Sequence, residues 1–392
     1  MAVSIFTSGS TGRPKGIILD HQALASSGMA FGSMVYLNQN TRAFQFASLA
    51  FDAAIMEILV TLMHGGCVCI PSEDERLNDV VGAIQRMSVS WTFLTPSIAS
   101  IIEPSAVPSL EVLVCGGEKL SREVISKWAN RVKLMNGYGP TETTIFAVVN
   151  REVYPNSDPS CIGHGIPCTL TWVVDSENHD RLSPLGAVGE LVLEGPALAR
   201  EYLKNPQRTA EAFVEEPAWI KSFDHPLPSP RRIFKTGDLV KYNPDGSIVC
   251  IGRKDHQVKL HGQRMELGEI EHRLHEDPQL VDQDAMECVL PNLVEIQKNL
   301  KTHLPIYMVP QTWAVLEKLP MLVSGKLDRK KISNWVEKVD EPTYARIMQD
   351  FDGIKRGDIE HKDDSQGTVI NVLCEILTQV REVITQTANK RA

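Results

Sequence analysis

The sequence predicts an α/β protein whose larger part contains a parallel, doubly wound sheet. Four short apolar runs have the length of buried strands, at residues 43–49, 67–70, 91–94 and 112–115. Helical spacing lies between or after them at residues 78–87 and 121–130. Strands that alternate with helices are typical of a parallel sheet covered by helices on both faces.

A change of sequence pattern after residue 155 predicts a second part of the chain that is richer in β-structure. Strand-like runs at 172–175 and 189–193 are followed by the turn sequence NPDGS at 243–247. Residues 252–255 follow an apolar strand and precede the polar run 263–271, so we expect a hinge there. Near the end, residues 368–377 have the apolar spacing of one amphipathic helix.

Length and composition are ordinary for a globular protein that is not a membrane or nucleic-acid binder. The 392 residues suffice for two domains, with 43% hydrophobic and 23% charged residues. A net charge of −9 and the lack of a long Lys/Arg run argue against nucleic acid or an anionic membrane as partner. No signal sequence follows Met1, no apolar run reaches membrane-spanning length, and the eight cysteines show no CxxC spacing. We therefore expect a cytoplasmic protein with reduced thiols.

A loop of small residues, IFTSGSTGRPKG at residues 5–16, has the composition of a phosphate-binding loop. Its backbone N–H groups and hydroxyls can surround an anion, and Lys15 adds a positive charge. It is not a Walker A loop, because Arg13 and Pro14 separate Gly12 from Lys15. The alternative is a flexible Gly/Ser turn.

Six further motifs follow in a fixed order: FD at 51–52, NGYGPTETT at 136–144, GEL at 189–191 with LAR at 198–200, KTGDL at 235–239, GRKDHQVK at 252–259 and SGKLDR at 324–329. Each is weak alone. Together they resemble the adenylate-forming, AMP-binding superfamily, and most closely the adenylation domains of non-ribosomal peptide synthetases. The resemblance extends from Ile5 to Lys330.

The resemblance implies an adenylate-forming fold with three parts. These are a large N-terminal subdomain of layered sheets and helices, a small β-barrel-like part, and a small α+β C-terminal subdomain. We expect a partial large subdomain at 1–252, a lid subdomain at 253–335, and a linker with a carrier-like helix at 336–392. Members of the family begin far upstream of the phosphate loop, so the large subdomain is expected to be truncated. The segment between 271 and 304 is also shorter than the family's.

The implied reaction is attack of an amino-acid carboxylate on the α-phosphate of ATP, with Mg²⁺, to give an aminoacyl-adenylate and pyrophosphate. The aminoacyl group would then form a thioester with phosphopantetheine on a separate carrier domain. Implied partners are the peptidyl carrier and condensation domains of a synthetase. Such chemistry depends on positioning and on stabilising charge that develops at the reacting oxygens.

Site residues carry over where this sequence matches the family's motifs. The phosphate loop comprises Thr7, Ser8, Gly9, Ser10, Thr11, Gly12 and Lys15. Adenine contacts fall to Asn136 and Tyr138, the α-phosphate contact to Thr141, and the Mg²⁺ ligand to Glu142. The ribose contacts are Asp238 and Arg253, with Asp255 as the hinge residue.

Two lysines also match the family. Lys326 matches the lysine that bridges the substrate carboxylate and the α-phosphate. Lys259 matches a lysine of the thioester-forming orientation, near which His261 replaces the family's usual arginine. The simpler alternatives are core packing for Tyr138, capping roles for Thr141, Glu142 and Asp238, and solvated side chains for the hinge residues and lysines.

Asp52 matches the acid that pairs with the substrate's α-ammonium group, which favours an amino acid over a fatty or aryl acid. A helix cap is the alternative role. The remaining wall positions are Ala53, Met56, Phe93, Val114, Gly116, Gly137, Ile145 and Phe146. Their apolar character and two glycines predict a roomy, dry pocket for a large hydrophobic side chain such as tryptophan or phenylalanine. Core packing would give the same composition.

Two other functions stay open for the chain. It could be an acyl- or aryl-CoA ligase, or a non-catalytic remnant of the fold.

Overall fold

The computed structural model describes residues 1–8, 14–223, 230–254, 257–260, 263–266, 270, 273–274, 289–305, 308–310 and 331. The chain divides into two compact units, and each is described by itself. One contains Met1–Thr7 and Pro14–Arg264, and the other Ser8–Arg13 and Met265–Ala392.

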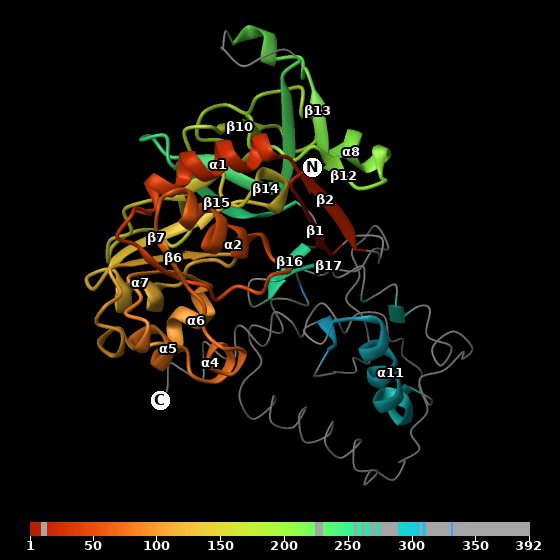
Figure 1. Cartoon of the computed structure of the whole chain (residues 1–392). Helices are drawn as coiled ribbons and strands as arrows, with labels where there is room; N and C mark the ends of the chain where they lie inside the picture. The colour runs from red at the N-terminus through yellow and green to blue at the C-terminus, as the bar shows by residue number, and fades with distance from the viewer. Residues whose placement is uncertain are drawn as a thin grey trace. The chain divides into compact units, whose positions relative to one another are not determined.

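A mixed sheet of twelve strands forms the centre of the first unit (Figure 1). Its parallel part has the order β4 (Cys67–Cys69), β3 (Arg42–Phe44), β5 (Trp91–Leu94), β6 (Val112–Gly116) and β7 (Lys133–Tyr138). The sheet continues through strands with antiparallel partners: β8 (Val148–Asn150), β9 (Cys161–Gly165), β15 (Ile248–Arg253), β14 (Arg232–Tyr242), β11 (Gly189–Glu194) and β10 (Leu170–Val174), with β13 (Phe213–Glu215) paired to β14. The predicted parallel sheet and the β-rich second part are both confirmed.

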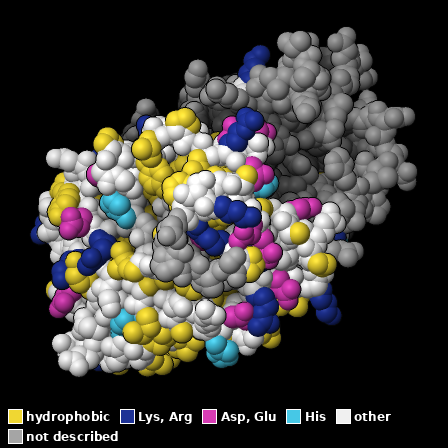
Figure 2. All heavy atoms as spheres, turned by 90° about the horizontal axis from the view of Figure 1, so that it is seen from above, with side chains coloured by type: hydrophobic (Ala, Val, Ile, Leu, Met, Phe, Trp, Pro, Cys, Tyr) yellow, Lys and Arg dark blue, Asp and Glu magenta, His cyan; other side chains and the backbone are white. Residues whose placement is uncertain are grey.

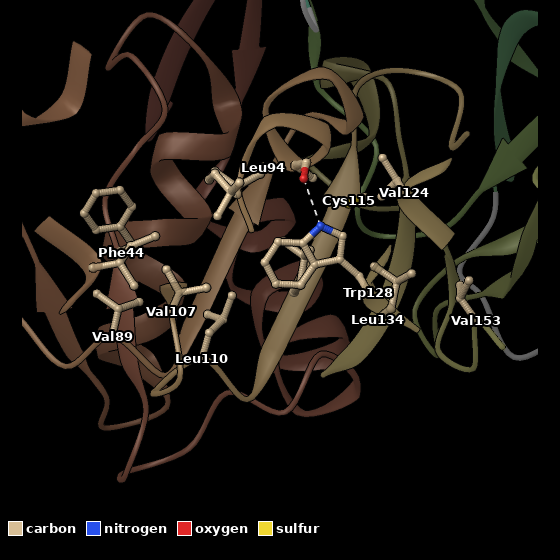
Figure 3. Packing of buried hydrophobic residues seen from close by; sticks show 14 of the residues in the cluster. Phe44, Val89, Leu94, Val107, Leu110, Cys115, Val124, Trp128, Leu134 and Val153 are labelled. Carbon is tan, nitrogen blue, oxygen red and sulfur yellow. Dashed lines mark hydrogen bonds between the residues drawn. The ribbon is translucent and has the colours of Figure 1, made fainter. Parts of the chain in front are cut away.

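Successive residues of the parallel strands point into two different cores, as period-2 geometry requires. Leu113 and Cys115 of β6 belong to a core with α5 (Val80–Arg86), α6 (Pro96–Ile101) and α7 (Arg122–Trp128). Figure 3 shows Trp128 among Leu94, Cys115 and Leu134, with its indole nitrogen 2.9 Å from the Ala99 carbonyl oxygen. Helices therefore cover one face of the sheet with an apolar layer.

The second core lies on the opposite face, because Val112 and Val114 of β6 pack with Phe31, Met56 and Val60. These residues come from α1 (His21–Met34), the π-helical turn η1 (Met56–Val60) and their neighbours α2 (Asp52–Ile55) and α3 (Thr61–Met63). The parallel part of the sheet is covered on both faces, as the alternation of strands and helices predicts.

A separate three-stranded sheet contains the two ends of the predicted phosphate loop, Thr7 and Lys15. Its order is β1 (Val3–Thr7), β2 (Lys15–Leu19) and β12 (Glu201–Tyr202). Ile17 and Leu19 of β2 pack with Tyr202, Phe213 and Phe234 in a small core. Burial of β2 fixes the strand on which Lys15 stands.

The remaining elements of the first unit are short: α4 (Glu73–Asn78), the 3-10 turns η2 (Pro104–Ala106), η3 (Thr141–Thr143) and η4 (Ile220–Ser222), and α8 (Pro206–Ala212). A two-stranded sheet pairs β16 (Gln257–Leu260) with β17 (Gln263–Glu266). In the second unit, α11 (Val289–His303) buries Ile296 and Leu300, four residues apart on one helix face. Over the described residues, no helix combines the length and apolar character needed to cross a bilayer.

Two predicted elements need correction. The strand predicted at 43–49 ends at Phe44, because the backbone N–H groups of Phe46 and Ala47 donate to the Glu57 carboxylate and not to a neighbouring strand. The helix predicted at 78–87 is present but shorter, because α5 (Val80–Arg86) begins after Asp79, whose side chain caps it by accepting from Gly82 N–H. The amphipathic helix predicted at residues 368–377 lies outside the described residues.

Acidic and basic side chains are interspersed over the face of the described part that Figure 2 shows, without a broad area of one sign.

Candidate active site

A buried ion pair joins the phosphate-loop strand to the 136–144 motif. Lys15 pairs with Thr7 across β1 and β2, and its Nζ lies 2.7 Å from Oε1 of Glu142. The Lys15 side chain is 5% exposed and that of Glu142 is 0% exposed. Two residues 127 positions apart are thus brought together in an environment where each charge needs the other.

Tyr202, which sequence analysis did not single out, completes this cluster. Its hydroxyl donates to Glu142 Oε1 at 2.8 Å and accepts from Lys15 Nζ at 3.3 Å. The ammonium also lies 4.7 Å from the centre of the Tyr202 ring, within cation–π range. The signal available in the sequence was an aromatic residue two positions after the LAR motif at 198–200.

The turn that presents Glu142 has an unusual backbone. Thr144 and Ile145 have φ values of 56° and 77°, and positive φ is costly for β-branched residues. Ser27 Oγ donates to the Thr144 carbonyl oxygen at 2.7 Å, and Thr144 Oγ1 donates to the Ala197 carbonyl oxygen at 2.7 Å. These buried contacts hold η3, which contains both Thr141 and Glu142, in one conformation.

A second cluster forms around Asp238, where β14 and β15 pair Asp238 with Arg253. Arg253 Nη1 lies 2.9 Å from Asp238 Oδ1, and the Tyr138 hydroxyl donates to Asp238 Oδ2 at 2.5 Å. Burial, and then the Asp238 carboxylate, raise the pKa of Tyr138 well above its usual value, so the phenol stays neutral. Three residues predicted to contact adenosine therefore meet in one place.

The part of β14 just before Asp238 is held by a buried acid, Glu190. Gly237 has φ 75°, and its N–H donates to Glu190 Oε1 at 3.1 Å. Lys254 Nζ lies 3.5 Å from the other oxygen of Glu190.

Asn136, predicted to contact adenine, is buried and donates from Nδ2 to the Cys161 carbonyl oxygen at 3.1 Å.

The predicted substrate-wall residues come together in one apolar cluster. Asp52 begins α2 and is half-buried. The cluster contains Ala53, Met56, Phe93, Val114, Ile145 and Phe146. The phenyl rings of Phe93 and Phe146 lie 6.0 Å apart.

The two predicted wall glycines face aromatic rings and not open space. A Cβ on Gly116 would lie 2.9 Å from Cε2 of Phe93, and one on Gly137 would lie 2.6 Å from Cζ of Phe146. The inference that the glycines enlarge the pocket is therefore wrong at these positions. Aromatic rings fill the volume that the missing side chains leave.

Glu57 is a buried acid next to Met56 that the sequence motifs did not indicate. Oε2 accepts from the N–H groups of Phe46 and Ala47 at 3.0 and 2.9 Å, and Oε1 has no hydrogen-bond partner within the described part of the chain. Burial raises the pKa of Glu57 to about 8. The two hydrogen bonds to Glu57 hold the segment before Asp52 against η1, the helical turn that contains Glu57.

This raised pKa predicts how stability changes with pH. The folded chain keeps the Glu57 proton up to about pH 8, whereas the unfolded chain loses it near pH 4.5. The contribution of Glu57 is therefore present below pH 4.5 and declines as the pH rises toward 8, by at most about 1.4 kcal/mol per pH unit. Glu57→Gln should be nearly as stable as the parent at pH 5 and more stable at pH 8.5, measured by urea denaturation. Parallel pH profiles for the two proteins would contradict this.

Thr7 of the predicted phosphate loop ends β1. Its hydroxyl is buried and has no partner among the described residues, so it can donate to an added phosphate oxygen.

Residues 9–12 of this loop, the hinge residue and two lysines are not described in full. Gly9, Ser10, Thr11, Gly12, Asp255 and Lys326 lie outside the described residues. Lys259 is in β16, but its side chain is not described.

The residues present fit a magnesium ion that is carried largely by phosphates. No group of three or more His, Cys, Asp or Glu side chains in the described ranges could hold a metal alone. Mg²⁺ commonly binds through one or two carboxylates together with substrate phosphates, and Glu142 is an oxygen donor of that kind beside Lys15. Glu142 would hold the ion, which would neutralise phosphate charge.

Comparison with known proteins gives a family and several similar chains. The AMP-binding enzyme family matches residues 1–203, just over half of the chain. The chain is 67% identical to Nonribosomal peptide synthetase 1 of Aspergillus fumigatus over 422 residues, which covers 97% of this chain and 7% of that protein. The alignment is longer than the 392-residue chain, so the relative has residues without a counterpart here. The chain thus spans a small fraction of this relative's length.

Solved structures agree with this match. An NRPS protein containing adenylation and PCP domains, bound to a vinylsulfonamide inhibitor, has a TM-score of 0.68 and 28% identity, covering 86% of this chain and 60% of that chain. The Vibrio cholerae adenylation domain AlmE, in complex with glycyl-adenosine-5'-phosphate, has a TM-score of 0.66 and 25% identity, covering 84% and 65%. The adenylate-forming fold is therefore confirmed, and the chain belongs to the AMP-binding enzyme family.

Proposed function

We propose that this chain activates an amino acid as its adenylate within a non-ribosomal peptide synthetase. One observation supports this most strongly. The segment from Tyr138 to Glu142 connects the Asp238–Arg253 cluster with the buried Lys15–Glu142 pair. A nucleoside group and a charged phosphate chain need such neighbouring sites, one that offers hydrogen bonds and one that offers opposite charges.

In the proposed reaction, a carboxylate oxygen of the substrate forms a bond to the α-phosphorus of ATP. The bond from that phosphorus to the bridging oxygen of the β-phosphate breaks, and pyrophosphate leaves with the electron pair. Lys15 would bind phosphate oxygens, and Asp238 would accept hydrogen bonds from the ribose hydroxyls. Magnesium would supply charge neutralisation when bound at Glu142. Lys326 is proposed to bridge the carboxylate and α-phosphate oxygens.

We propose a hydrophobic amino acid as the substrate. Asp52 would pair with the α-ammonium group, and the aromatic rings of Phe93 and Phe146 offer an apolar wall. Similarity to a protein that contains adenylation and PCP domains supports transfer of the aminoacyl group to a carrier phosphopantetheine. Carrier and condensation domains are thus the proposed partners.

The test is substrate-dependent exchange of labelled pyrophosphate into ATP, with a panel of hydrophobic amino acids and the matching acids that lack the amine. We expect exchange with amino acids, because Asp52 provides a charge for the ammonium group. Exchange only with the amine-free acids would indicate an acyl- or aryl-CoA ligase. Exchange with neither class would indicate a non-catalytic remnant, and either result would overturn the proposal.

Asp52→Ala should reduce exchange with amino acids at least about tenfold, since hydrogen bonds to charged groups contribute about 1.5 to 3 kcal/mol. Exchange with the amine-free acids should not fall. Asp79→Ala is the matched control, because Asp79 caps a helix by accepting from Gly82 N–H. It should lower thermal stability without changing substrate preference. A similar loss for both classes of acid in Asp52→Ala would assign Asp52 a capping role.

A further inference from the structure

Tyr202 stands at the centre of the buried ion pair and has no role in the motifs carried over from the family. It lies on β12, which pairs with β2 through Tyr202 and Ile17, and it is 3% exposed. Its ring also packs against Phe213, with ring centres 5.7 Å apart. The hydroxyl is therefore fixed from both the strand and the ring.

The hydroxyl does two things that no apolar side chain can do. It donates to Glu142 Oε1 at 2.8 Å and accepts from Lys15 Nζ at 3.3 Å. A phenolic oxygen can serve as donor and acceptor at once. Because Glu142 is fully buried, protein groups replace water in solvating its carboxylate.

We propose that Tyr202 is a positioning residue for the triphosphate end of the nucleotide site. It holds the Glu142 carboxylate and the Lys15 ammonium in the orientation from which they meet Mg²⁺ and the phosphates of ATP. This inference rests on the proposed function, because it assigns Tyr202 a part in the same site. Without the hydroxyl, both charged groups gain rotational freedom that nucleotide binding must remove.

The experiment measures equilibrium binding of ATP by calorimetry at several magnesium concentrations, together with binding of AMP. Tyr202→Phe keeps the ring and removes the hydroxyl. We expect its affinity for ATP with magnesium to fall about tenfold, as for loss of a hydrogen bond to a charged group. Its affinity for AMP, which has no β- or γ-phosphate, should be unchanged. In pyrophosphate exchange, KM for ATP should rise while KM for the amino acid stays constant.

Tyr242→Phe is the matched control. Tyr242 is a half-buried tyrosine on β14, and its hydroxyl donates to the Thr171 carbonyl oxygen at 2.6 Å. This variant loses the hydrogen bonds of that hydroxyl to the Thr171 carbonyl oxygen and Oγ1 but should bind both nucleotides as the parent does. Such a result separates a local effect at the ion pair from a general effect of removing a hydroxyl.

Three results would overturn the role of Tyr202. These are parental ATP affinity in Tyr202→Phe, an equal loss of ATP and AMP affinity, and failure of that variant to fold. Failure of the proposed function has a different signature, in which the parent binds ATP with magnesium but exchanges no pyrophosphate with any acid. A parent that binds no ATP would overturn both.

Discussion

Replacing Lys15 by methionine is expected to lower the free energy of unfolding by about 3 to 5 kcal/mol, the usual cost of removing one partner of a buried ion pair. The variant keeps most of the aliphatic volume but removes the ammonium that lies 2.7 Å from Glu142. The carboxylate is 0% exposed, so bulk water cannot take over its stabilisation. Urea denaturation at neutral pH measures the loss.

A second substitution tests the cause. Lys15→Met combined with Glu142→Gln should recover most of the lost stability, because the amide is neutral and can still accept from the Tyr202 hydroxyl. ATP binding should stay lost, since both charges are absent. A double variant no more stable than Lys15→Met would show that packing, and not charge, explains the loss.

An exposed ion pair supplies the control. Arg200 Nη2 lies 2.5 Å from Asp20 Oδ1, but the two side chains are 49% and 31% exposed. Arg200→Met should therefore change stability by no more than about 1 kcal/mol. The contrast between the two variants depends on burial, because both pairs have short contacts.

Strands buried on both faces could be predicted from sequence, and loops held by a distant side chain could not. The run at 91–94 is β5, and the run at 112–115 differs from β6 only by including one residue fewer. The run at 43–49 is also largely apolar, yet the backbone N–H groups of Phe46 and Ala47 in its second half donate hydrogen bonds to the Glu57 carboxylate. Local patterns do not contain that contact, because it depends on where the next helix packs.

The same limit applies to the candidate site. The ordered motifs indicated Lys15, Glu142, Tyr138 and Asp238, which the structure brings together in two clusters. Tyr202 and Glu57 were missed because their importance arises from tertiary contacts. The apparent space beside Gly137 was misjudged for the same reason, since the Phe146 ring occupies it. Residue type indicates possible chemistry, but packing decides which groups share a site.

Gly139→Ala is expected to have the second large effect, a loss of about 3 kcal/mol in the free energy of unfolding. A Cβ at this position would overlap the Ile145 carbonyl oxygen and lie 2.9 Å from Cα of Phe146. Both neighbours are backbone atoms, so no side-chain rotation can relieve the contact. The turn cannot move easily either, because Ser27 and Ala197 hold Thr144 through hydrogen bonds.

The loss should extend to function, because the strained turn presents Glu142 to Lys15. We expect Gly139→Ala to weaken ATP binding as well as to lower the urea midpoint. Gly252→Ala is the control, since a Cβ there meets no atom within 4 Å and its φ is not in the left-handed range. That change should be neutral or stabilising by up to about 1 kcal/mol. Equal stability of the two variants would mean that the 136–146 segment relaxes freely, and that close backbone packing does not set the geometry of Glu142.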